Sequence, residues 1–383
     1  MDLMRAAPIS TRLETTVLWL MPSVPWLVPR NASGELQHMA TRPPAVRLVD
    51  RGAAHPSKGY FRRALERTRT ATVLPPPPGG PRVGAASLPF TLKLREVAAL
   101  FKLRLASLVV VSAALGYLMG VPPGAFSWPN ILLLSLAGFL VTGASNALNQ
   151  VIEQEQDALM SRTKGRPLVC GTLSTREAII IAVLSGTLGV ATLWAVFGPL
   201  SGILGLLALF MYAALYTPLK RHSPWAVFVG ALPGAIPPML GFVAAQGHFG
   251  LGPGLQFLVQ FVWQFPHFWA IAWVLDDDYA KAGFRLLPSK GGRDARTATW
   301  ILFSALLVVP AGMLPWIFGF SGIGSMVVAI AAGLLMVIPA IMLFRSIGLG
   351  VSCRAQSRHA RRLMFASFLH LPLVQLAYVL DRV

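Results

Sequence analysis

Cysteine is almost absent from the sequence, which contains only Cys170 and Cys353 among 383 residues. The two lie far apart, and neither belongs to a CxxC motif. Zinc knuckles and redox-active dithiols both depend on closely spaced cysteines, so the sequence gives no indication of either kind of site. We interpret both cysteines as bystanders to the chemistry.

Charged residues are also scarce, at 13%, and the acidic ones are the scarcer kind. The chain has 33 Lys and Arg against 15 Asp and Glu, a net charge of +18, and 55% of its residues are hydrophobic. Soluble globular domains do not normally combine these values, so the composition predicts a polytopic membrane protein. We expect no nucleic acid partner, because the Lys and Arg residues gather in particular loops, as membrane topology requires.

The first ninety or so residues have no periodic apolar face. Pro75–Pro78 is followed by two glycines, which is typical of a linker. Thr16–Val28 is apolar but short and interrupted by proline, so we do not expect it to span a bilayer. We predict that residues 1–92 are a disordered or weakly structured basic extension, and that 93–383 form the membrane domain. An organelle transit segment, or a true start at Met39, are the alternatives for the extension.

From Phe101 onward, apolar stretches of membrane length alternate with short connections. This alternation predicts an all-α bundle of nine transmembrane helices. We place them near residues 104–121, 129–149, 177–197, 201–217, 225–245, 255–275, 299–319, 323–344 and 363–380.

The charges in the connections predict the orientation of the bundle. Four connections contain no Lys, Arg, Asp or Glu, namely 122–128, 198–200, 246–254 and 320–322. The charged loops all fall on the other side, together with the N-terminal arm; they are 150–176, 218–224, 276–298 and 345–362. The positive-inside rule assigns that side to the cytoplasm, or to the matrix in a mitochondrion. The N-terminus is therefore expected inside and the C-terminus outside.

The inner loop 150–176 contains acidic residues that topology does not require. If the preceding helix continues, Asn149, Glu153 and Asp157 recur every four residues on one face. Glu155 then points away from them. Carboxylates are hard oxygen ligands that suit Mg²⁺, which proteins usually bind through one or two carboxylates plus substrate phosphates. The spacing therefore predicts a site for a metal ion and a phosphate group.

Phosphate-binding cations accompany these acids. Arg162, Lys164 and Arg166 follow the first acidic cluster, and loop 276–298 adds four aspartates among five Lys and Arg residues. Two such loops facing each other would clamp a diphosphate between metal ions, with Lys and Arg on the remaining oxygens. Two solvated loops with ordinary surface ion pairs are the alternative interpretation.

The interior of the bundle is also unusual in composition. One predicted span, GALPGAIPPMLG from Gly230, is rich in glycine and proline, so we expect a kinked and closely packed helix there. Gln264 and His267 lie in the middle of the aromatic-rich span that follows. A polar residue within a membrane span is a candidate functional residue. A hydrogen bond between helices is the structural alternative.

These motifs together resemble a known family. The stretch NALNQVIEQEQDALMSRTKGRPLVCG, from Asn146 to Gly171, is similar to the first signature of the UbiA superfamily of intramembrane prenyltransferases, in its protohaem IX farnesyltransferase branch. Three further blocks agree in the same order: YTPLKRHSPWAVFVGALPGAIPPMLG, WQFPHFWAIAW and DDYAKAGFRLLP. The resemblance covers about residues 95–383, and the N-terminal arm lies outside it.

The resemblance implies a nine-helix UbiA-type bundle around a central cavity. It also implies the transfer of a farnesyl group from farnesyl diphosphate to a vinyl group of haem B, with addition of water, to give haem O and diphosphate for haem-copper oxidase biogenesis. Mg²⁺ is the implied cofactor, held by Glu153, Asp157 and Asp278. Asn149 completes the implied catalytic set.

Further residues carry an implied role in binding the substrates. They are Lys102, Arg104, Arg162, Lys164, Arg166, Tyr216, Lys220, Arg221, His267 and Lys281. The chain departs from the family pattern at Glu153, where Asp is frequent, and at Leu103, where Pro is frequent. Glu155 aligns with a commonly acidic position, but helical spacing turns it away from Asp157.

The expected location is a bacterial inner membrane, with the mitochondrial inner membrane as the alternative. Haem A synthase or oxidase assembly factors are expected partners beside the two substrates and the lipid bilayer. Two other functions stay open: a UbiA-type prenyltransferase acting on an aromatic quinone precursor, and a membrane transporter or scaffold. The PHFWAIAW and YTPLKR blocks argue against the first. Acids clustered at one surface, not at the bilayer midplane, argue against the second.

Overall fold

The structure, a computed structural model, describes residues 90–383. Within this part of the chain, nine helical stretches are long and apolar enough to cross a membrane. They are α4 (Leu103–Gly120), α5 (Trp128–Ile152), α8 (Thr175–Phe197), α9 through α10 (Pro199–Leu219), α11 (Ala226–Gln246), α12 (Leu251–Lys281), α13 (Ala295–Ile317), α14 (Ile323–Gly348) and α15 (Cys353–Leu380). The predicted all-α, nine-span fold is confirmed here. The predicted extension 1–92 lies almost entirely outside the described residues.

Polar residues at the helix starts set several of these boundaries. Ser174 and Glu177 form a capping box at the start of α8, each side chain accepting a hydrogen bond from the other's backbone N–H. The Asp294 carboxylate accepts from Thr297 N at 2.8 Å at the start of α13. Such caps satisfy backbone N–H groups that the helix leaves free, so these side chains fix where α8 and α13 begin.

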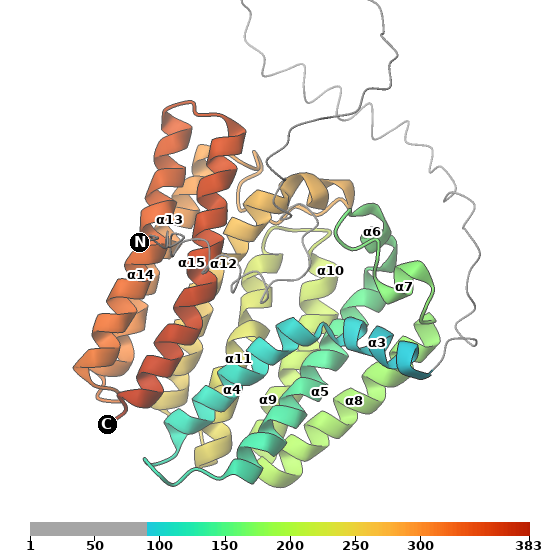
Figure 1. Cartoon of the computed structure of the whole chain (residues 1–383), viewed down its shortest axis with the longest axis vertical. Coiled ribbons are helices and arrows are strands. Elements are labelled where there is room, and N and C mark those ends of the chain that lie inside the picture. Colours follow the sequence, from blue (N-terminus) through green and yellow to red (C-terminus); the bar gives the residue numbers. More distant parts are fainter. Residues whose placement is uncertain (1–89) are drawn as a thin grey trace, which may run out of the picture. The chain divides into compact units, whose positions relative to one another are not determined.

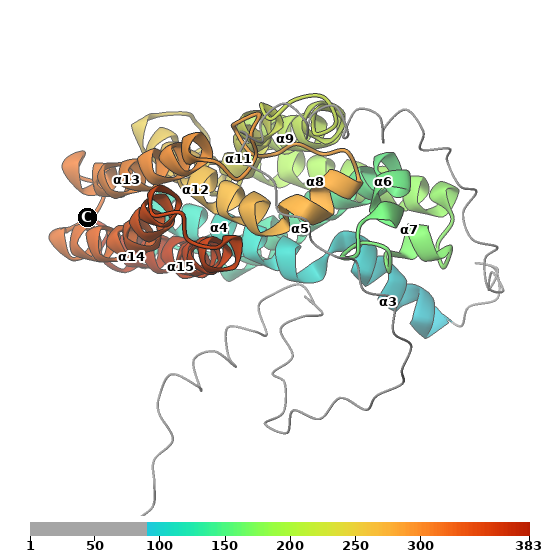
Figure 2. The ribbon, with the colours of Figure 1, turned by 90° about the horizontal axis from the view of Figure 1, so that it is seen from above.

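The long helices lie side by side, with α13, α14 and α15 at one edge of the bundle and α5 and α8 toward the other (Figures 1 and 2). The helices α4, α11 and α12 connect the two groups, since α4 packs on α5, α11 and α15, and α12 packs on α11, α13 and α15. The short helices α6 (Gln154–Leu159), α7 (Pro167–Cys170) and α10 (Thr217–Leu219) gather at one end, and the C-terminus lies at the other (Figure 1). We refer to the first as the charged end.

Glycines bring α4 and α11 into close backbone contact. A Cβ atom at Gly241 would collide with the backbone carbonyl of Ala113, and one at Gly116 with that of Pro238. Small residues at such crossings are the usual means of tight helix packing in membranes. The predicted close packing of the glycine- and proline-rich helix is therefore confirmed.

Three features at the charged end differ from the expectation. Helix α12 continues to Lys281, so Asp276, Asp277 and Asp278 lie on a helix and not in a loop. Helix α15 begins at Cys353, so most of the predicted loop 345–362 is helical. Hydropathy predicts where a helix leaves the bilayer but not where the helix ends. A helix can continue beyond the apolar stretch, because Arg, Gln and Ala are good helix formers. A further helix, α3 (Phe90–Phe101), precedes the first span.

Candidate active site

The first acidic motif lies where α5 gives way to α6. Glu153 is the junction between the two helices, yet its N–H donates to Asn149 O at 3.0 Å and its carbonyl accepts from Asp157 N at 2.8 Å. Helical spacing therefore persists across the junction. Asn149, Glu153 and Asp157 are all buried, at 3% exposure or less, whereas Glu155 is exposed. The predicted shared face is confirmed.

Three cations surround this motif. Lys220 Nζ lies 2.6 Å from Glu153 Oε1, and Arg166 forms an ion pair with Asp157. Lys102 Nζ donates to Asn149 Oδ1 at 3.4 Å. These six residues are called the charged cluster below. Because they come from α5, α6, the α6–α7 loop, the α3–α4 junction and the end of α10, the cluster ties these segments together at one place.

Burial and neighbouring charge act against each other in the charged cluster. Burial raises the pKa of Asp157, while the Arg166 guanidinium opposes the rise. Burial lowers the pKa of Lys220, and the Glu153 carboxylate opposes that change. Burial first, and then the charges of Arg166 and Lys220, hold the pKa of Lys102 well below its usual value. Additional negative charge arriving here would favour the charged forms of these lysines.

The carboxylates of the cluster fit one mode of Mg²⁺ binding. No group of three or more His, Cys, Asp or Glu side chains in residues 90–383 is placed to hold a metal ion. Glu153 and Asp157 are nevertheless one helical turn apart, and Asp157 Oδ1 is buried with no hydrogen-bond partner among the described residues. One or two carboxylates completed by substrate phosphates are the usual Mg²⁺ ligands in enzymes. The pair suits this mode and not a complete protein cage.

Asp278 links the second acidic motif to the first. Its carboxylate accepts from the backbone N–H of Ser161 at 2.9 Å and of Arg162 at 3.4 Å, and Lys281 Nζ lies 2.9 Å from it. Lys281 also donates to Ser161 Oγ at 3.0 Å. The end of α12 is thus fastened to the loop after α6. That Asp278 also binds metal stays a prediction.

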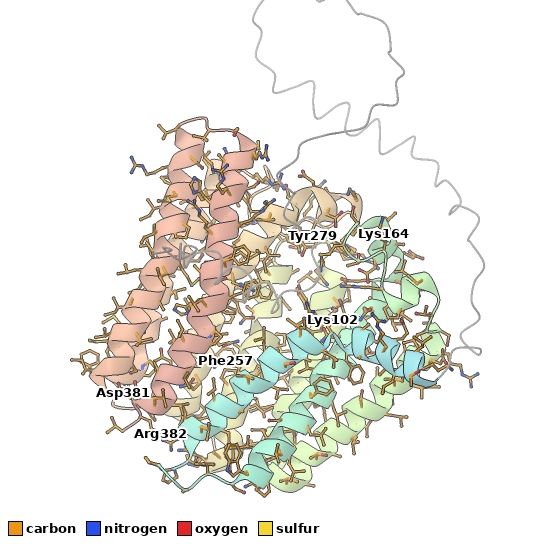
Figure 3. The ribbon with its side chains drawn as sticks, viewed as in Figure 1. Lys102, Lys164, Phe257, Tyr279, Asp381 and Arg382 are labelled. Atoms are coloured by element: carbon orange, nitrogen blue, oxygen red, sulfur yellow. The ribbon has the colours of Figure 1, made fainter. Side chains whose placement is uncertain are left out.

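The other predicted substrate-binding residues divide between the cluster and its rim. The ring of Tyr216 lies under Lys220, with Nζ 4.7 Å from the ring centroid. Arg221 donates to Ile152 O at 2.8 Å and so fastens the end of α5. Lys164 and Arg104 are exposed. Figure 3 shows Lys102, Lys164 and Tyr279 near the charged end, away from Asp381 and Arg382 at the opposite end.

Arg162 is half-buried near the second motif. Its guanidinium carbon lies 5.9 Å from the centroid of the Tyr279 ring, which belongs to α12. A guanidinium over an aromatic face is held by the ring quadrupole. Arg162 therefore lies at the contact between the two motifs, and its phosphate-binding role stays a prediction.

Thr217 is a member of the site that the sequence analysis missed. It is fully buried, and its Oγ1 accepts from Asn149 Nδ2 at 3.1 Å and donates to Tyr212 O at 2.8 Å. Tyr212 O also accepts the backbone N–H of Thr217, at the end of the π-helical turn Met211–Tyr216, a feature frequent at functional sites. Asn149 Nδ2 also donates to Glu153 Oε2 at 3.0 Å. Thr217 therefore holds the Asn149 amide with its oxygen toward Lys102. An uncharged residue of this kind has no charge pattern to reveal it.

His267 lies in the apolar part of α12, apart from the charged cluster. Ser367 Oγ donates to Met364 O at 2.6 Å and lies 2.7 Å from His267 Nδ1, so the histidine donates to the serine. The imidazole also stacks on Trp263, with ring centroids 4.5 Å apart. The ring is therefore fixed in orientation, and the hydrogen bond found for it in the described residues uses Nδ1 and not Nε2.

A membrane-embedded helical bundle with buried carboxylates and cations at one end is the architecture of an intramembrane enzyme that acts on an anionic substrate. Residues 109–369 match the UbiA prenyltransferase family. The chain belongs to this family, and it is a prenyltransferase by that membership.

Known proteins agree with this assignment. The chain is 47% identical over 285 residues to a protoheme IX farnesyltransferase of Cytophaga hutchinsonii, covering 74% of this chain and 96% of that protein. It resembles the solved digeranylgeranylglyceryl phosphate synthase, with a TM-score of 0.62, 17% identity and coverage of 76% and 98% of the two chains. A UbiA homolog from Archaeoglobus fulgidus, solved with DMAPP and Mg²⁺, gives a TM-score of 0.50, 16% identity and coverage of 73% and 99%. The two structures support the fold.

Proposed function

We propose that this protein transfers the farnesyl group of farnesyl diphosphate to a vinyl group of haem B, with addition of water, to give haem O and diphosphate. The observation that carries the proposal is the charged cluster, in which two buried carboxylates meet three cations where the apolar spans end. A diphosphate headgroup requires such a place, and its isoprenoid tail requires the apolar interior beside it. Relatives named protoheme IX farnesyltransferase support haem as the acceptor.

Glu153 and Asp157 would hold Mg²⁺ together with the diphosphate, and Asp278 would complete the second half of the clamp. The UbiA homolog solved with DMAPP and Mg²⁺ supports a divalent ion in this family. The ion would neutralise charge that develops on the departing diphosphate. The free Asp157 Oδ1 is the ligand atom best placed to receive it.

The cations exchange partners when the substrate arrives. Arg166 and Lys220 now neutralise the two carboxylates, and they would turn to diphosphate oxygens once the metal takes over that role. Arg162, Lys164 and Lys281 extend the same positive surface toward the rim. Charge-assisted hydrogen bonds from these side chains stabilise the leaving group more strongly than the intact ester, because its charge grows as the bond breaks.

The haem is expected deeper in the bundle, where His267 is available. Its Nδ1 donates to Ser367, and no hydrogen bond found in the described residues uses its Nε2. An imidazole with a free Nε2 suits a contact on the haem side of the reaction. The surrounding aromatic rings, Trp263 and Phe368 among them, keep water from the allylic cation.

The proposed location is a bacterial inner membrane with the charged end in the cytoplasm, and haem A synthase or oxidase assembly factors are the proposed partners for product transfer. Both native cysteines support a simple test, because Cys170 and Cys353 are exposed near the charged end. A membrane-impermeant maleimide should label them in inside-out vesicles. Labelling in intact spheroplasts instead would overturn the orientation.

The reaction itself is tested by product analysis. Purified protein in nanodiscs is given haem B and farnesyl diphosphate, with and without Mg²⁺, and the extracted haem is examined by mass spectrometry. We expect a Mg²⁺-dependent product with the mass of hydroxyethylfarnesyl haem. Unchanged haem, together with turnover of an aromatic acceptor, would show a different member of the family.

A further inference from the structure

A row of polar side chains runs through the apolar part of α12. Gln256, Gln260, Gln264 and His267 are spaced by four, four and three residues, and all are buried. This spacing keeps them on one helix face over roughly 16 Å of the span. We call these four residues the polar row. Polar groups inside a membrane are costly, so an uninterrupted row of them requires an explanation.

Hydrogen bonds to backbone carbonyls fix the orientation of two of these amides. Gln264 Nε2 donates to Ala231 O at 2.9 Å and to Gln260 O at 3.2 Å, and Gln260 Nε2 donates to Gly234 O at 3.3 Å. Carbonyl oxygens only accept, so each amide nitrogen must face α11 or its own helix. The amide oxygen of Gln264 also lies against α11, where a Cβ atom at Gly234 would collide with it, and the amide oxygen of Gln260 faces Gln375 of α15.

A glutamine of α15 completes the arrangement. Gln375 is buried, and its Nε2 donates to Ser112 Oγ at 2.8 Å and to Gln260 Oε1 at 3.1 Å. The polar row thus meets α4 and α15 as well as α11. Both amide hydrogens of Gln375 are used in these bonds, which leaves its oxygen as an acceptor.

Several amide groups of these glutamines take part in none of the hydrogen bonds described above. The hydrogen bonds found in residues 90–383 include Nε2 of Gln264 and of Gln375, but none reaches the amide oxygen of either residue or the amide of Gln256. Interhelical packing explains the amide nitrogens but not these atoms. Buried polar groups are nearly always satisfied, by ordered water where protein supplies no partner. The atoms left over are those that water would bind.

A short series of contacts connects Gln264 of the polar row with the charged cluster. Gln264 Nε2 donates a hydrogen bond to the backbone carbonyl of Ala231. The preceding residue, Gly230, lies so close to the Tyr216 ring that a Cβ atom at this position would collide with the ring. The same ring lies under Lys220, which pairs with Glu153. Three contacts, from Gln264 to Ala231, from Gly230 to Tyr216 and from Tyr216 to Lys220, therefore lead from the polar row to the charged cluster.

We propose that the polar row and Gln375 bind the water molecule that the reaction consumes, and hold it against the haem vinyl group. This inference rests on the proposed function. The C1–O bond of farnesyl diphosphate breaks, and C1 bonds to the terminal vinyl carbon, leaving the ring-attached carbon electron-poor. The water oxygen bonds to that carbon, and its proton leaves with the diphosphate. One water is used, and no oxidant or reductant is needed.

Neutral amides suit this task better than charged groups. An amide oxygen accepts the hydrogens of the water, so the lone pairs of the water face away from the amide and toward the cation. A carboxylate in the same place would trap the allylic cation itself, and an ammonium would repel it. The arrangement admits one bound water while the aromatic rings exclude bulk water.

Product analysis of matched variants tests the proposal. Gln264→Met and Gln375→Met keep the length of the side chain and remove the acceptor, while Gln356→Met changes a buried glutamine of α15 that donates to Val351 O near the start of the helix. Assays in ¹⁸O-water measure diphosphate release and the haem products together. We expect Gln264→Met and Gln375→Met to raise the share of product lacking one water, an alkene formed by proton loss, by about tenfold. Gln356→Met should give the hydrated, labelled product.

Unchanged hydration in both variants, even with slower turnover, would overturn the proposal, because packing damage slows all products equally. A cryo-EM map of the intact protein in nanodiscs, at a resolution that shows water, provides a second measurement that needs no activity. Density is expected beside Gln264 Oε1 and Gln375 Oε1, and a dry interior there would contradict the inference. A wild-type protein that forms no farnesylated haem would instead refute the proposed function.

Discussion

The charged cluster and the polar row both bring polar side chains into the interior, but the first consists mainly of charged residues and the second of neutral ones. At the charged end, Glu153 and Asp157 are neutralised by Lys220 and Arg166. In the interior the polar groups are glutamines, serines and a histidine, joined by hydrogen bonds to backbone carbonyls and to each other. Within residues 90–383, the fully charged side chains lie near or beyond the ends of the apolar spans.

The difference follows from what each region must do. A diphosphate and its metal carry several charges, and ion pairs that exchange partners can receive them without leaving a charge unpaired. An allylic cation must meet a haem edge without meeting a stronger nucleophile, so the interior is limited to neutral groups. The two regions are in contact through Tyr216 and Gly230, which allows one substrate to span both.

The largest effect is expected from removing a charge at the charged end. Asp157→Asn keeps the shape of the side chain but removes the carboxylate, and we expect turnover to fall by about a thousandfold. Glu155→Gln is the matched control, two residues away and exposed, and should behave as wild type. Steady-state kinetics in nanodiscs measures both. If both variants lost the same amount of turnover, the buried Asp157 would not differ in function from the exposed Glu155, which would contradict the prediction.

A smaller loss is expected where the two acidic motifs meet. Asp278→Asn weakens the bonds to the backbone of Ser161 and Arg162, and charge-assisted bonds of this kind correspond to about a 10- to 100-fold change in kcat/KM. Asp277→Asn is the control, since that side chain is 86% exposed and pairs only with Arg293. If Asp277→Asn loses as much activity as Asp278→Asn, the loss comes from the removal of a negative charge from this end of α12 and not from the Asp278 hydrogen bonds.

Thr217 tests whether a neutral group can act within the charged cluster. Thr217→Val removes one hydrogen bond to Asn149, and we expect kcat to fall by about fivefold to tenfold and the apparent Mg²⁺ requirement to rise. Thr217→Ser keeps the hydroxyl and should restore both values. A packing role alone would leave the Mg²⁺ requirement unchanged and would not be rescued by serine.

The smallest effect is expected at the rim. Lys164 is exposed, so Lys164→Gln should raise KM for farnesyl diphosphate by about twofold to threefold and leave kcat unchanged. The difference from wild type should disappear at high salt, because exposed charges are screened. A large, salt-independent fall in kcat would place Lys164 inside the cluster.

Much of the fold was predictable because membrane spans obey simple rules. Apolar length and the alternation of charged and uncharged connections located all nine spans found in residues 90–383. Helix ends beyond the membrane surface, as in α12 and α15, were not predictable from hydropathy. Helix α3 was missed because it is too short and too polar to be taken for a span.

The site was predictable where it is charged. Helical spacing placed Asn149, Glu153 and Asp157 together, and the structure adds which cation each of them meets. Thr217 and Gln375 could not be found, because each acts through a contact made by residues distant in the sequence. Neutral hydrogen-bonding groups give no pattern in a single sequence beyond their presence in an apolar span, which Gln264 and His267 did show.

The most direct test of the account is the metal dependence of farnesyl diphosphate binding at the charged end. Isothermal titration of a non-hydrolysable farnesyl diphosphate analogue into the full-length protein in nanodiscs would be compared with and without Mg²⁺, for wild type and Asp157→Asn. The account predicts tight binding only for wild type with Mg²⁺, and weak binding after EDTA or in the variant. Equal affinity under all four conditions would contradict it.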